Sequence, residues 1–397
     1  MPDTQRPASL FATRLRQLLA AALACTLLSC GGGGGGGGGT SSSAASSASA
    51  QRSFWMGFTS WPWDATTTAV DWTWTRVKAE GDLISHHIDE GVPWPQAATG
   101  VNATYPTSFQ GLIDTHRTQA AGKRHLVSLN PLSIGRDGMA LLRTEQTNQP
   151  LTAPWNTAAL DSTSVKTAYT NYVLRMINEL SPDVLLTGIE VNLLIEKNPA
   201  LWPAFVNLQC HVYTEVKKVR PDLPIGVSLF AVGLLPEWST EYDLAQQQTA
   251  LAALGSCVDV VAWSVYPYMS ALLADSLPSD FFSRFVGRLP ASLQGKTMGI
   301  SESGYPAQTW SASGLTWYGT PTKQRDMLSL MLSEANRLNM RFVAWFTIRD
   351  YDQLWNGALA QDPTALVWRD TGLYGEDGAE RAGLGVWRDW RARTAAP

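Results

Sequence analysis

Basic residues, cysteines and histidines are all scarce in this chain of 397 residues. With 30 Lys and Arg against 34 Asp and Glu, the formal net charge is −4, so the chain lacks the basic excess that neutralises nucleic-acid phosphates. Only four cysteines and five histidines occur, and no set of metal ligands converges in the sequence, so we expect no metal and no cofactor. The G-x-S-x-G elbow of serine hydrolases is also missing. These absences disfavour nucleic-acid binding, zinc chemistry and a serine nucleophile.

Apolar and aromatic residues, by contrast, are plentiful. Hydrophobic residues make up 45% of the chain and charged residues only 16%, a composition typical of a well-buried globular protein. The 17 tryptophans are the strongest compositional signal. Because an indole ring packs in a core and also stacks on the apolar face of a sugar, this signal is compatible with carbohydrate binding.

The first 30 residues have the pattern of an export signal. Arg14 and Arg16 precede an apolar run at 18–28 that is too short to anchor the chain in a bilayer. The run ends in Leu-Leu-Ser-Cys-Gly, which resembles the lipobox of bacterial lipoproteins. The resemblance implies a signal peptide at 1–29, a lipid on Cys30, and an exported protein tethered to a membrane, on the periplasmic or cell-surface side of the outer membrane. An ordinary secretory signal, with Cys30 incidental, is the alternative.

Residues 30–53 are expected to form a disordered tether. Nine glycines are followed by a Ser- and Ala-rich stretch, and neither has large apolar side chains to bury. Random-coil scaling gives this tether a reach of roughly 25 Å. The two cysteines beyond it, Cys210 and Cys257, form one disulfide in an oxidising compartment or remain two buried free thiols.

From residue 54 to residue 397, short β-rich runs alternate with helical patterns. Apolar side chains at steps of three and four predict helices at 200–219 and 322–338. Eight strand-plus-helix units predict an α/β fold, a single (β/α)8 TIM barrel, with a doubly wound open sheet as the alternative. The segment 131–161 is expected to fold over the barrel mouth. The predicted strands are 54–59, 82–88, 125–130, 184–191, 225–230, 258–265, 297–301 and 342–347.

Two glutamates stand at the ends of predicted strands. Glu190 lies in Gly-Ile-Glu-Val-Asn, and Glu302 lies in Ser-Glu-Ser-Gly-Tyr-Pro. Catalytic groups of such barrels project from the carboxyl ends of the strands. A carboxylate among apolar residues needs a partner, a raised pKa or a catalytic purpose. We interpret the pair as catalytic; a bond to a helix end or to an arginine at the barrel rim is the alternative.

Three segments around these residues resemble one enzyme superfamily. Residues 301–306 resemble the E-T-G-[WY]-P signature around the nucleophile of clan A retaining (β/α)8 glycoside hydrolases, most of all the endo-β-1,4-galactanases and endo-β-1,3-glucanases. Residues 188–192 resemble the element that carries the acid/base, and residues 259–268 resemble a sixth strand that ends in Tyr-Pro. The resemblance extends from residue 54 to about residue 390.

The resemblance implies a role for each matching residue. Glu302 is the nucleophile and Glu190 the acid/base of a double displacement, for which two carboxyls about 5–5.5 Å apart are needed. Tyr266 hydrogen-bonds Glu302, and Trp345 forms the aromatic platform beneath the sugar. Tyr266 alternatively serves only to end its strand.

One residue departs from the superfamily pattern. Its members carry Asn directly before the acid/base, where this Asn binds the 2-hydroxyl of the sugar, but Ile189 stands here. Asn192, two residues after Glu190, is the candidate replacement. The departure puts activity, substrate and the role of Glu190 in doubt, with Glu196 as the alternative acid/base.

Aromatic residues are expected to build the substrate groove. Trp61 and Trp63 follow the first predicted strand, Trp94 follows the second, and His86 is expected to bind sugar at the end of the second. Trp310 and Trp317 lie in the loop after the seventh strand. For any one of these tryptophans, packing in the core is the alternative.

The sequence therefore predicts a retaining glycoside hydrolase that acts on a β-linked polysaccharide or oligosaccharide. The expected partners are this carbohydrate and, through the lipid, a membrane, with no nucleic acid and no obligate protein partner. A non-catalytic carbohydrate-binding lipoprotein on a decayed barrel is the alternative, which Ile189 favours.

Overall fold

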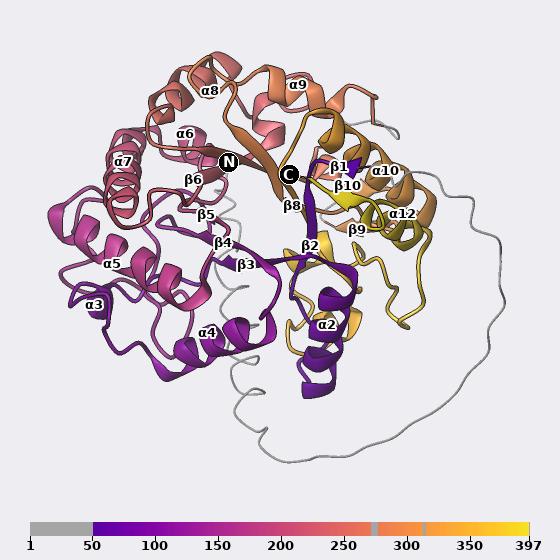
Figure 1. Cartoon of the computed structure of the whole chain (residues 1–397), viewed down its shortest axis with the longest axis horizontal. Helices are drawn as coiled ribbons and strands as arrows, with labels where there is room; N and C mark the ends of the chain where they lie inside the picture. Colours follow the sequence, from indigo (N-terminus) through magenta and orange to yellow (C-terminus); the bar gives the residue numbers. More distant parts are fainter. Residues whose placement is uncertain (1–50, 271–276, 313–314, 397) are drawn as a thin grey trace.

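The (β/α)8 barrel predicted from the sequence is present. The computed structural model describes residues 51–270, 277–312 and 315–396, and eight parallel strands close in the order β11-β2-β3-β4-β5-β6-β7-β8, surrounded by helices (Figure 1). The predicted signal peptide, most of the tether and Cys30 lie outside the described residues. The strands are β2 (Trp55–Thr59), β3 (Leu83–Ile88), β4 (Arg124–Leu129), β5 (Val184–Leu186), β6 (Ile225–Phe230), β7 (Val260–Val265), β8 (Thr297–Ser303) and β11 (Phe342–Trp345).

Amphipathic helices cover the outside of the barrel. Side chains of Thr66, Ser162, Asp243 and Thr320 cap the first turns of α2, α5, α8 and α10. No helix of the described residues is both long and apolar enough to cross a membrane. The main helices are α2 (Thr67–Glu80), α4 (Thr107–Gln119), α5 (Thr163–Leu180), α7 (Trp202–Val219), α8 (Leu244–Leu251), α9 (Phe281–Gly287), α10 (Pro321–Arg337) and α12 (Ala382–Arg391). The short helices are α3 (Trp94–Ala97), α6 (Leu193–Lys197) and α11 (Asp352–Asn356).

Alternation along the strands produces two separate cores. In β3, Leu83 points into the barrel, where it packs against side chains such as Leu126 and Leu186. Its neighbour Ile84 points outward into the larger core between barrel and helices. In a regular strand, the side chains therefore point alternately into the barrel and outward to the helices.

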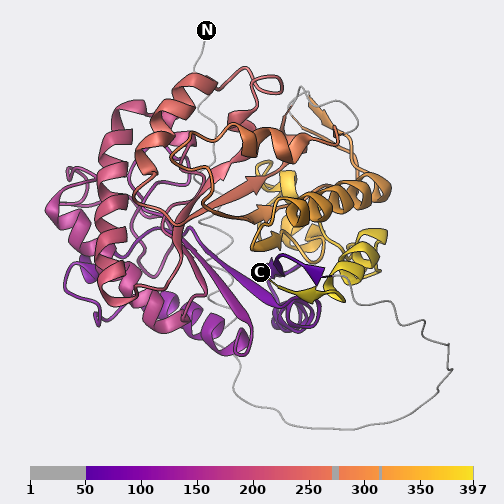
Figure 2. The ribbon, with the colours of Figure 1, turned by 45° about the horizontal axis from the view of Figure 1, so that its top comes forward.

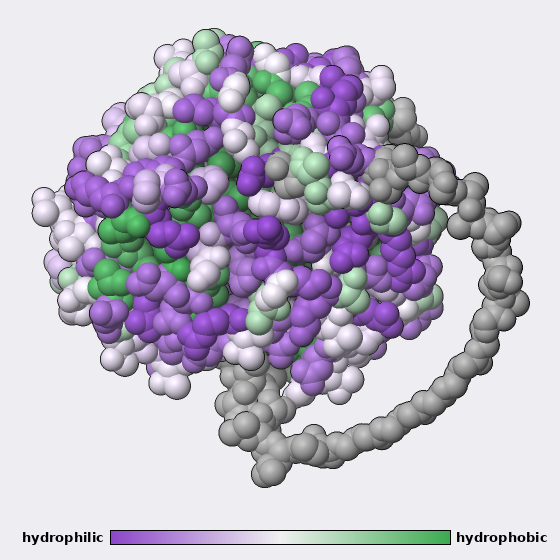
Figure 3. All heavy atoms as spheres, viewed as in Figure 1, coloured by the Kyte–Doolittle hydropathy of each residue, from purple (hydrophilic) through white to green (hydrophobic). Residues whose placement is uncertain are grey.

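Hydrophilic residues predominate on the molecular surface drawn in Figure 3.

Cys210 of α7 and Cys257 are joined by a disulfide, one of the two states that the sequence left open. The bond links residues 47 positions apart. By the chain-entropy relation, closing such a loop in the unfolded chain stabilises the fold by about 4 kcal/mol.

The two ends of the described domain meet at the amino-terminal side of the barrel. Strand β1 (Gln51–Arg52) pairs in parallel with β12 (Thr394–Ala395), so the start of the domain lies beside its C-terminal residues (Figure 2). Gln51, the first described residue, therefore lies at this side, opposite the carboxyl ends of the strands.

Candidate active site

A cavity of about 210 Å³ opens at the carboxyl ends of the barrel strands. It contains both predicted catalytic residues together with polar and aromatic side chains from five other parts of the chain. The lining residues are Thr59, Trp61, His87, Asp89, Ile134, Arg136, Glu190, Glu302, Phe346, Tyr351 and Trp368. The structure therefore brings Glu190 and Glu302, which are far apart in the sequence, to one concave site.

Glu302 faces the cavity because β8 contains a bulge. Trp263 of β7 pairs with Ile300, and the next residue of β7, Ser264, pairs with Glu302, so that Ser301 has no opposite residue. Ile300 packs in the outer core, and strict alternation would turn Glu302 outward as well. The extra residue reverses the alternation and turns the Glu302 carboxyl into the barrel.

Glu190 reaches the same cavity from the irregular segment after β5. The sequence predicted a strand to residue 191, but β5 ends at Leu186, and the next residue, Thr187, points outward and donates from Oγ1 to Gln209 Oε1 of α7 at 2.8 Å. Glu190 has a φ of 50°, in the left-handed region that is unfavourable for a residue with a Cβ. Its N–H donates to Ser228 Oγ at 2.8 Å. The neighbouring strand β6 thus holds this turn in place.

Ser264 of β7 and Tyr266, the residue directly after β7, hold the two carboxyls. Ser264 Oγ donates to Glu190 Oε1 at 2.8 Å, and the Tyr266 hydroxyl donates to Glu302 Oε1 at 2.5 Å. The second bond is the one that the superfamily resemblance implied. On the other side, His87 Nδ1 lies 3.6 Å from Glu302 Oε2. Each carboxyl therefore has a fixed orientation before any substrate binds.

Arg136 is a member of the site that the sequence analysis missed. It belongs to segment 131–161, which does lie at the barrel mouth as expected. Arg136 Nη1 lies 2.8 Å from Asp89 Oδ2, and Nη2 lies 3.4 Å from Glu190 Oε2. Its side chain is only 5% exposed, so a buried positive charge lies against the two acidic groups. No motif marks such an arginine; the length and position of the segment were the only signals.

Burial raises the pKa of both carboxyls. For Glu302, burial outweighs the hydrogen bond from Tyr266 and the charge of Arg136 and raises the pKa to about 7. For Glu190, burial raises the pKa against the opposing charge of Arg136, and the nearby Glu302 raises it further. The two carboxylates repel each other when both are ionised, so ionisation of Glu302 makes ionisation of Glu190 less favourable.

Of the two predicted groove residues that follow β2, Trp61 lines the cavity and Trp63 does not. Trp61 lines the cavity and packs edge-on against Phe346, with ring centroids 5.4 Å apart. Trp63 does not line it, because its ring packs against Arg349, whose guanidinium carbon lies 4.0 Å from the ring centroid. Only the first of the two is available as a platform in this cavity.

The predictions for Trp345 and Trp94 are wrong. Trp345 is fully buried on the outer side of β11, where its Nε1 donates to the carbonyl of Thr371 at 2.9 Å; the next residue, Phe346, faces the cavity. Trp94 is also fully buried, and its Nε1 donates to the carbonyl of Ala140 at 2.8 Å. Both indoles are core residues rather than sugar-binding surfaces.

The predictions for His86 and Asn192 are also wrong. His86 points outward from β3 into a buried contact with His116, while its neighbour His87 lines the cavity. The Asn192 side chain pairs with the backbone of Phe230, accepting from its N–H at 2.7 Å and donating to its carbonyl at 3.1 Å. Asn192 therefore holds the loop after β5 and does not replace the asparagine missing at position 189.

Three further candidates lie outside the cavity lining. Trp310 and Trp317 stack on each other, with centroids 4.1 Å apart, in the hairpin of β9 (Trp310–Ala312) and β10 (Leu315–Trp317). Glu196 Oε1 accepts from the N–H of Asp243 at 3.2 Å, before the start of α8. Glu196 is thus in a structural contact, and Glu190 is the glutamate that shares the cavity with Glu302.

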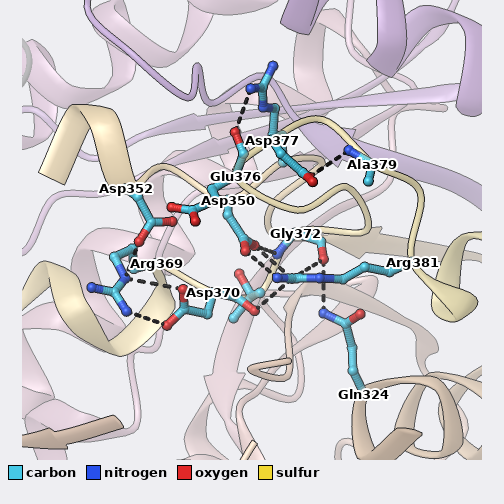
Figure 4. Close-up of polar contacts among 12 residues, drawn as sticks. Gln324, Asp350, Asp352, Arg369, Asp370, Gly372, Glu376, Asp377, Ala379 and Arg381 are labelled. Atoms are coloured by element: carbon cyan, nitrogen blue, oxygen red, sulfur yellow. Dashed lines mark hydrogen bonds and ion pairs between the residues drawn. The ribbon is translucent and has the colours of Figure 1, made fainter. Parts of the chain in front are cut away.

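The segment after β11 forms the aromatic side of the cavity. A buried ion network, shown in Figure 4, supports this segment. Three carboxylates have oxygens within 4.8 Å of one another, the spacing of metal ligands, but two arginines already pair with them. The acids are Asp350, Asp352 and Asp370, and the arginines are Arg369 and Arg381. The two arginines offset two of the three formal negative charges, and the network fixes the position of the segment that carries Phe346, Tyr351 and Trp368.

Comparison with known proteins gives structural matches only. No protein-family model and no curated protein sequence matches this chain. Fungal β-1,4-galactanases match with a TM-score of 0.53 and 15% identity, over 85% of this chain and 94% of theirs. The GH53 catalytic domain of Ignisphaera aggregans matches with a TM-score of 0.51 and 18% identity, over 78% and 84%. GH5_18 from Streptomyces cattleya, in complex with GlcNAc, matches with 0.57 and 14%, over 88% and 83%.

The chain therefore has a (β/α)8 barrel fold similar to the fold of these glycoside hydrolase structures. At these identities the similarity concerns the barrel as a whole. It confirms the fold that the resemblance of three short segments had implied.

Proposed function

We propose that this protein is a retaining glycoside hydrolase that cleaves a β-linked saccharide by double displacement. The observation that supports this most directly is the shared cavity of Glu190 and Glu302, in which each carboxyl accepts a hydrogen bond from its own donor, Ser264 of β7 or Tyr266 directly after it. Two carboxyl groups that differ in protonation are what this chemistry requires. The structural neighbours add support at the level of the fold.

In the first step, a carboxylate oxygen of Glu302 attacks the anomeric carbon. The bond from this carbon to the leaving oxygen breaks, and Glu190 transfers its proton to that oxygen. Arg136 assists, because a positive charge beside Glu190 stabilises the carboxylate that remains and so makes Glu190 a stronger acid. The aglycone leaves as an alcohol, and the sugar stays bound to Glu302 as an ester.

In the second step, Glu190 acts as a base. It takes a proton from a water molecule, whose oxygen attacks the anomeric carbon and breaks the ester to Glu302. Two inversions at the same carbon give a product with the anomeric configuration of the substrate. The starting state, with Glu190 protonated and Glu302 ionised, is then restored.

The contact to the hydroxyl beside the reacting carbon must come from a side chain other than residue 189. Ile189 is buried and Asn192 is engaged with the backbone of β6. His87, Asp89 and Arg136 are the polar cavity residues from β3 and from the loops that follow β3 and β4. We propose that this group replaces the usual asparagine. β-1,4-Galactans and β-mannosides are the substrates to test first, because the matched structures include β-1,4-galactanases and a complex with Manβ1-4GlcNAc.

The test is a panel of β-galactans, β-glucans and mannans, followed by NMR of the first product formed. Hydrolysis with the β-anomer appearing first supports double displacement. An activated 2-fluoro glycoside should label Glu302, as seen by mass spectrometry of peptides. Tight glycan binding without hydrolysis or label would instead favour the second candidate, a non-catalytic carbohydrate-binding lipoprotein. Ile189 favours this candidate, because it stands where the superfamily has the asparagine that binds the 2-hydroxyl.

Replacing Tyr266 by Phe should move the acidic limb of the pH–activity profile to higher pH. The hydroxyl bond to Glu302 opposes the effect of burial, so its loss raises the pKa of Glu302 further above about 7. Glu302 is then protonated, and inactive as a nucleophile, at a higher pH. A hydrogen bond to a charged group implies a displacement of about 1–2 pH units. Profiles of kcat/KM for the wild type and the variant measure it; an unmoved acidic limb would show that Tyr266 does not tune Glu302.

We also propose that the protein is an exported lipoprotein tethered through Cys30. The lipobox-like sequence and the glycine-rich segment support this proposal. In a bacterial host, the chain should incorporate labelled palmitate and fractionate with membranes, and Cys30→Ser should abolish both. Cys25→Ser, within the apolar run, is the matched control and should retain the label.

A further inference from the structure

A second cavity lies at the opposite end of the barrel, at the amino-terminal ends of the strands. Its volume is about 530 Å³; seven of its nine lining residues begin or precede four adjacent strands, β2 to β5, and the other two belong to α12 and β12. Four basic and two acidic side chains line it, a formal excess of two positive charges in a chain whose net charge is −4. The lining residues are Arg52, Trp55, Asp82, Gly122, Lys123, Arg124, Asp183, Arg391 and Ala395.

The two carboxylates of this cavity are already engaged. Asp82 pairs with Arg52 and with Arg391 at 3.0 and 2.9 Å, and it also accepts from the N–H of Met56. Asp183 pairs with one further arginine and accepts from the backbone of β4. Each carboxylate bonds to the backbone at the start of a neighbouring strand, so both acids have a structural role. The basic side chains remain in excess.

The excess charge lies around Lys123 and Trp55. Lys123 Nζ donates to the carbonyl of Gly81 at 2.8 Å, and no ion pair links it to a carboxylate of the described residues. The guanidinium groups of Arg124 and Arg341 lie 5.0 and 4.8 Å from the ring centroid of Trp55. Burial and the charge of Arg391 lower the pKa of Lys123, as expected in a positive environment.

We propose that this cavity binds a phosphate group. An ammonium and several guanidinium groups that converge on an open cavity match a phosphate dianion, whose oxygens accept bonds from both kinds of donor. The phosphate belongs either to a soluble compound or to a lipid headgroup, since basic clusters beside a membrane bind anionic lipids. The site lies beside β1, which contains the first described residues, and opposite the active-site cavity. Lipid bound here would direct the active site away from the membrane.

The first test compares phosphate with chloride at equal ionic strength, using the full chain. A ligand that binds the folded state raises Tm, and we expect phosphate at about ten times its Kd to raise it by about 2 °C. Lys123→Gln keeps a hydrogen-bond donor for Gly81 but removes the charge, and calorimetry should show phosphate binding about fivefold weaker. Lys166→Gln is the control, since Lys166 bonds Asn207 on the outer helices and should leave phosphate binding unchanged.

The second test uses vesicles of phosphatidylglycerol and of phosphatidylcholine with the same three proteins. Severalfold weaker sedimentation of Lys123→Gln with phosphatidylglycerol, relative to both the wild type and Lys166→Gln, identifies a lipid headgroup as the ligand. Phosphate binding that depends on Lys123, with equal sedimentation of all three proteins, identifies a soluble phosphate compound. If Lys123→Gln matches the wild type in both tests, or phosphate acts no differently from chloride and vesicles do not discriminate, the proposal is wrong. Neither test depends on hydrolytic activity.

Discussion

Glu302→Gln is expected to abolish turnover, lowering kcat/KM by about 10⁴-fold or more. A neutral amide cannot form the ester to the anomeric carbon, yet it has the size of the carboxyl and its oxygen still accepts from Tyr266. The fold should remain intact. Because burial raises the pKa of Glu302 from 4.5 to about 7, the folded wild type loses stability as pH rises between these two values, and the loss is complete above the higher one. The variant should therefore gain in Tm relative to the wild type at pH 8, and the gain should shrink towards pH 5.

Initial rates on the most reactive glycan of the panel, with Tm measured at both pH values, check this result. Glu196→Gln is the matched control: the same chemical change in a contact with the residues before α8, outside the cavity, should leave kcat/KM within a few-fold of the wild type. Hydrolysis by Glu302→Gln within tenfold of the wild type would show that Glu302 is not the nucleophile.

Glu190→Gln should produce a loss that depends on the leaving group. Without a proton donor, cleavage of a natural glycosidic bond should slow by about 10²–10⁴-fold. An aryl glycoside with an acidic phenol needs no protonation to leave, so its first step should be largely retained, and the glycosyl ester on Glu302 should accumulate because no base activates water. A burst of phenol followed by slow turnover is the expected time course.

Addition of azide should restore turnover of this variant and give a glycosyl azide of retained configuration, because a charged nucleophile needs no general base. The isosteric partner change Ser264→Ala, which removes the hydrogen bond to Glu190 but leaves its carboxyl, should show neither the burst nor the azide effect. Equal losses on natural and activated substrates for Glu190→Gln would assign the acid/base role to another residue.

Much of the barrel could be predicted from the sequence, because strands covered on both faces are apolar throughout. The predicted strand at 225–230 coincides with β6, and the predicted end of the helix at 219 coincides with the end of α7. Apolar runs and helical spacing are local properties of the chain, set by the faces that each element must bury. The positions of Glu190 and Glu302 near strand ends follow from the same local pattern.

The errors at His86 and Trp345 have one physical cause, the orientation of adjacent side chains. His86 and Trp345 each lie next to the residue that lines the cavity, His87 and Phe346. For His87 a signal existed, because it continues the alternation of Leu83 and Ser85, whereas Ile84, His86 and Ile88 form the opposite face. For Glu302, strict alternation along β8 would have predicted an outward side chain, because only the bulge at Ser301 turns it inward.

The sequence by itself determined that this chain builds eight strand-and-helix units and that two glutamates stand where the strands end, because burial and periodicity act within each segment. Only the tertiary structure decided which side chains face one another across the barrel. Bulges, a left-handed turn at Glu190 and the entry of Arg136 from a distant loop depend on the pairing of neighbouring strands and on the packing of whole segments. No residue carries that information alone, because it arises from the closure of the barrel.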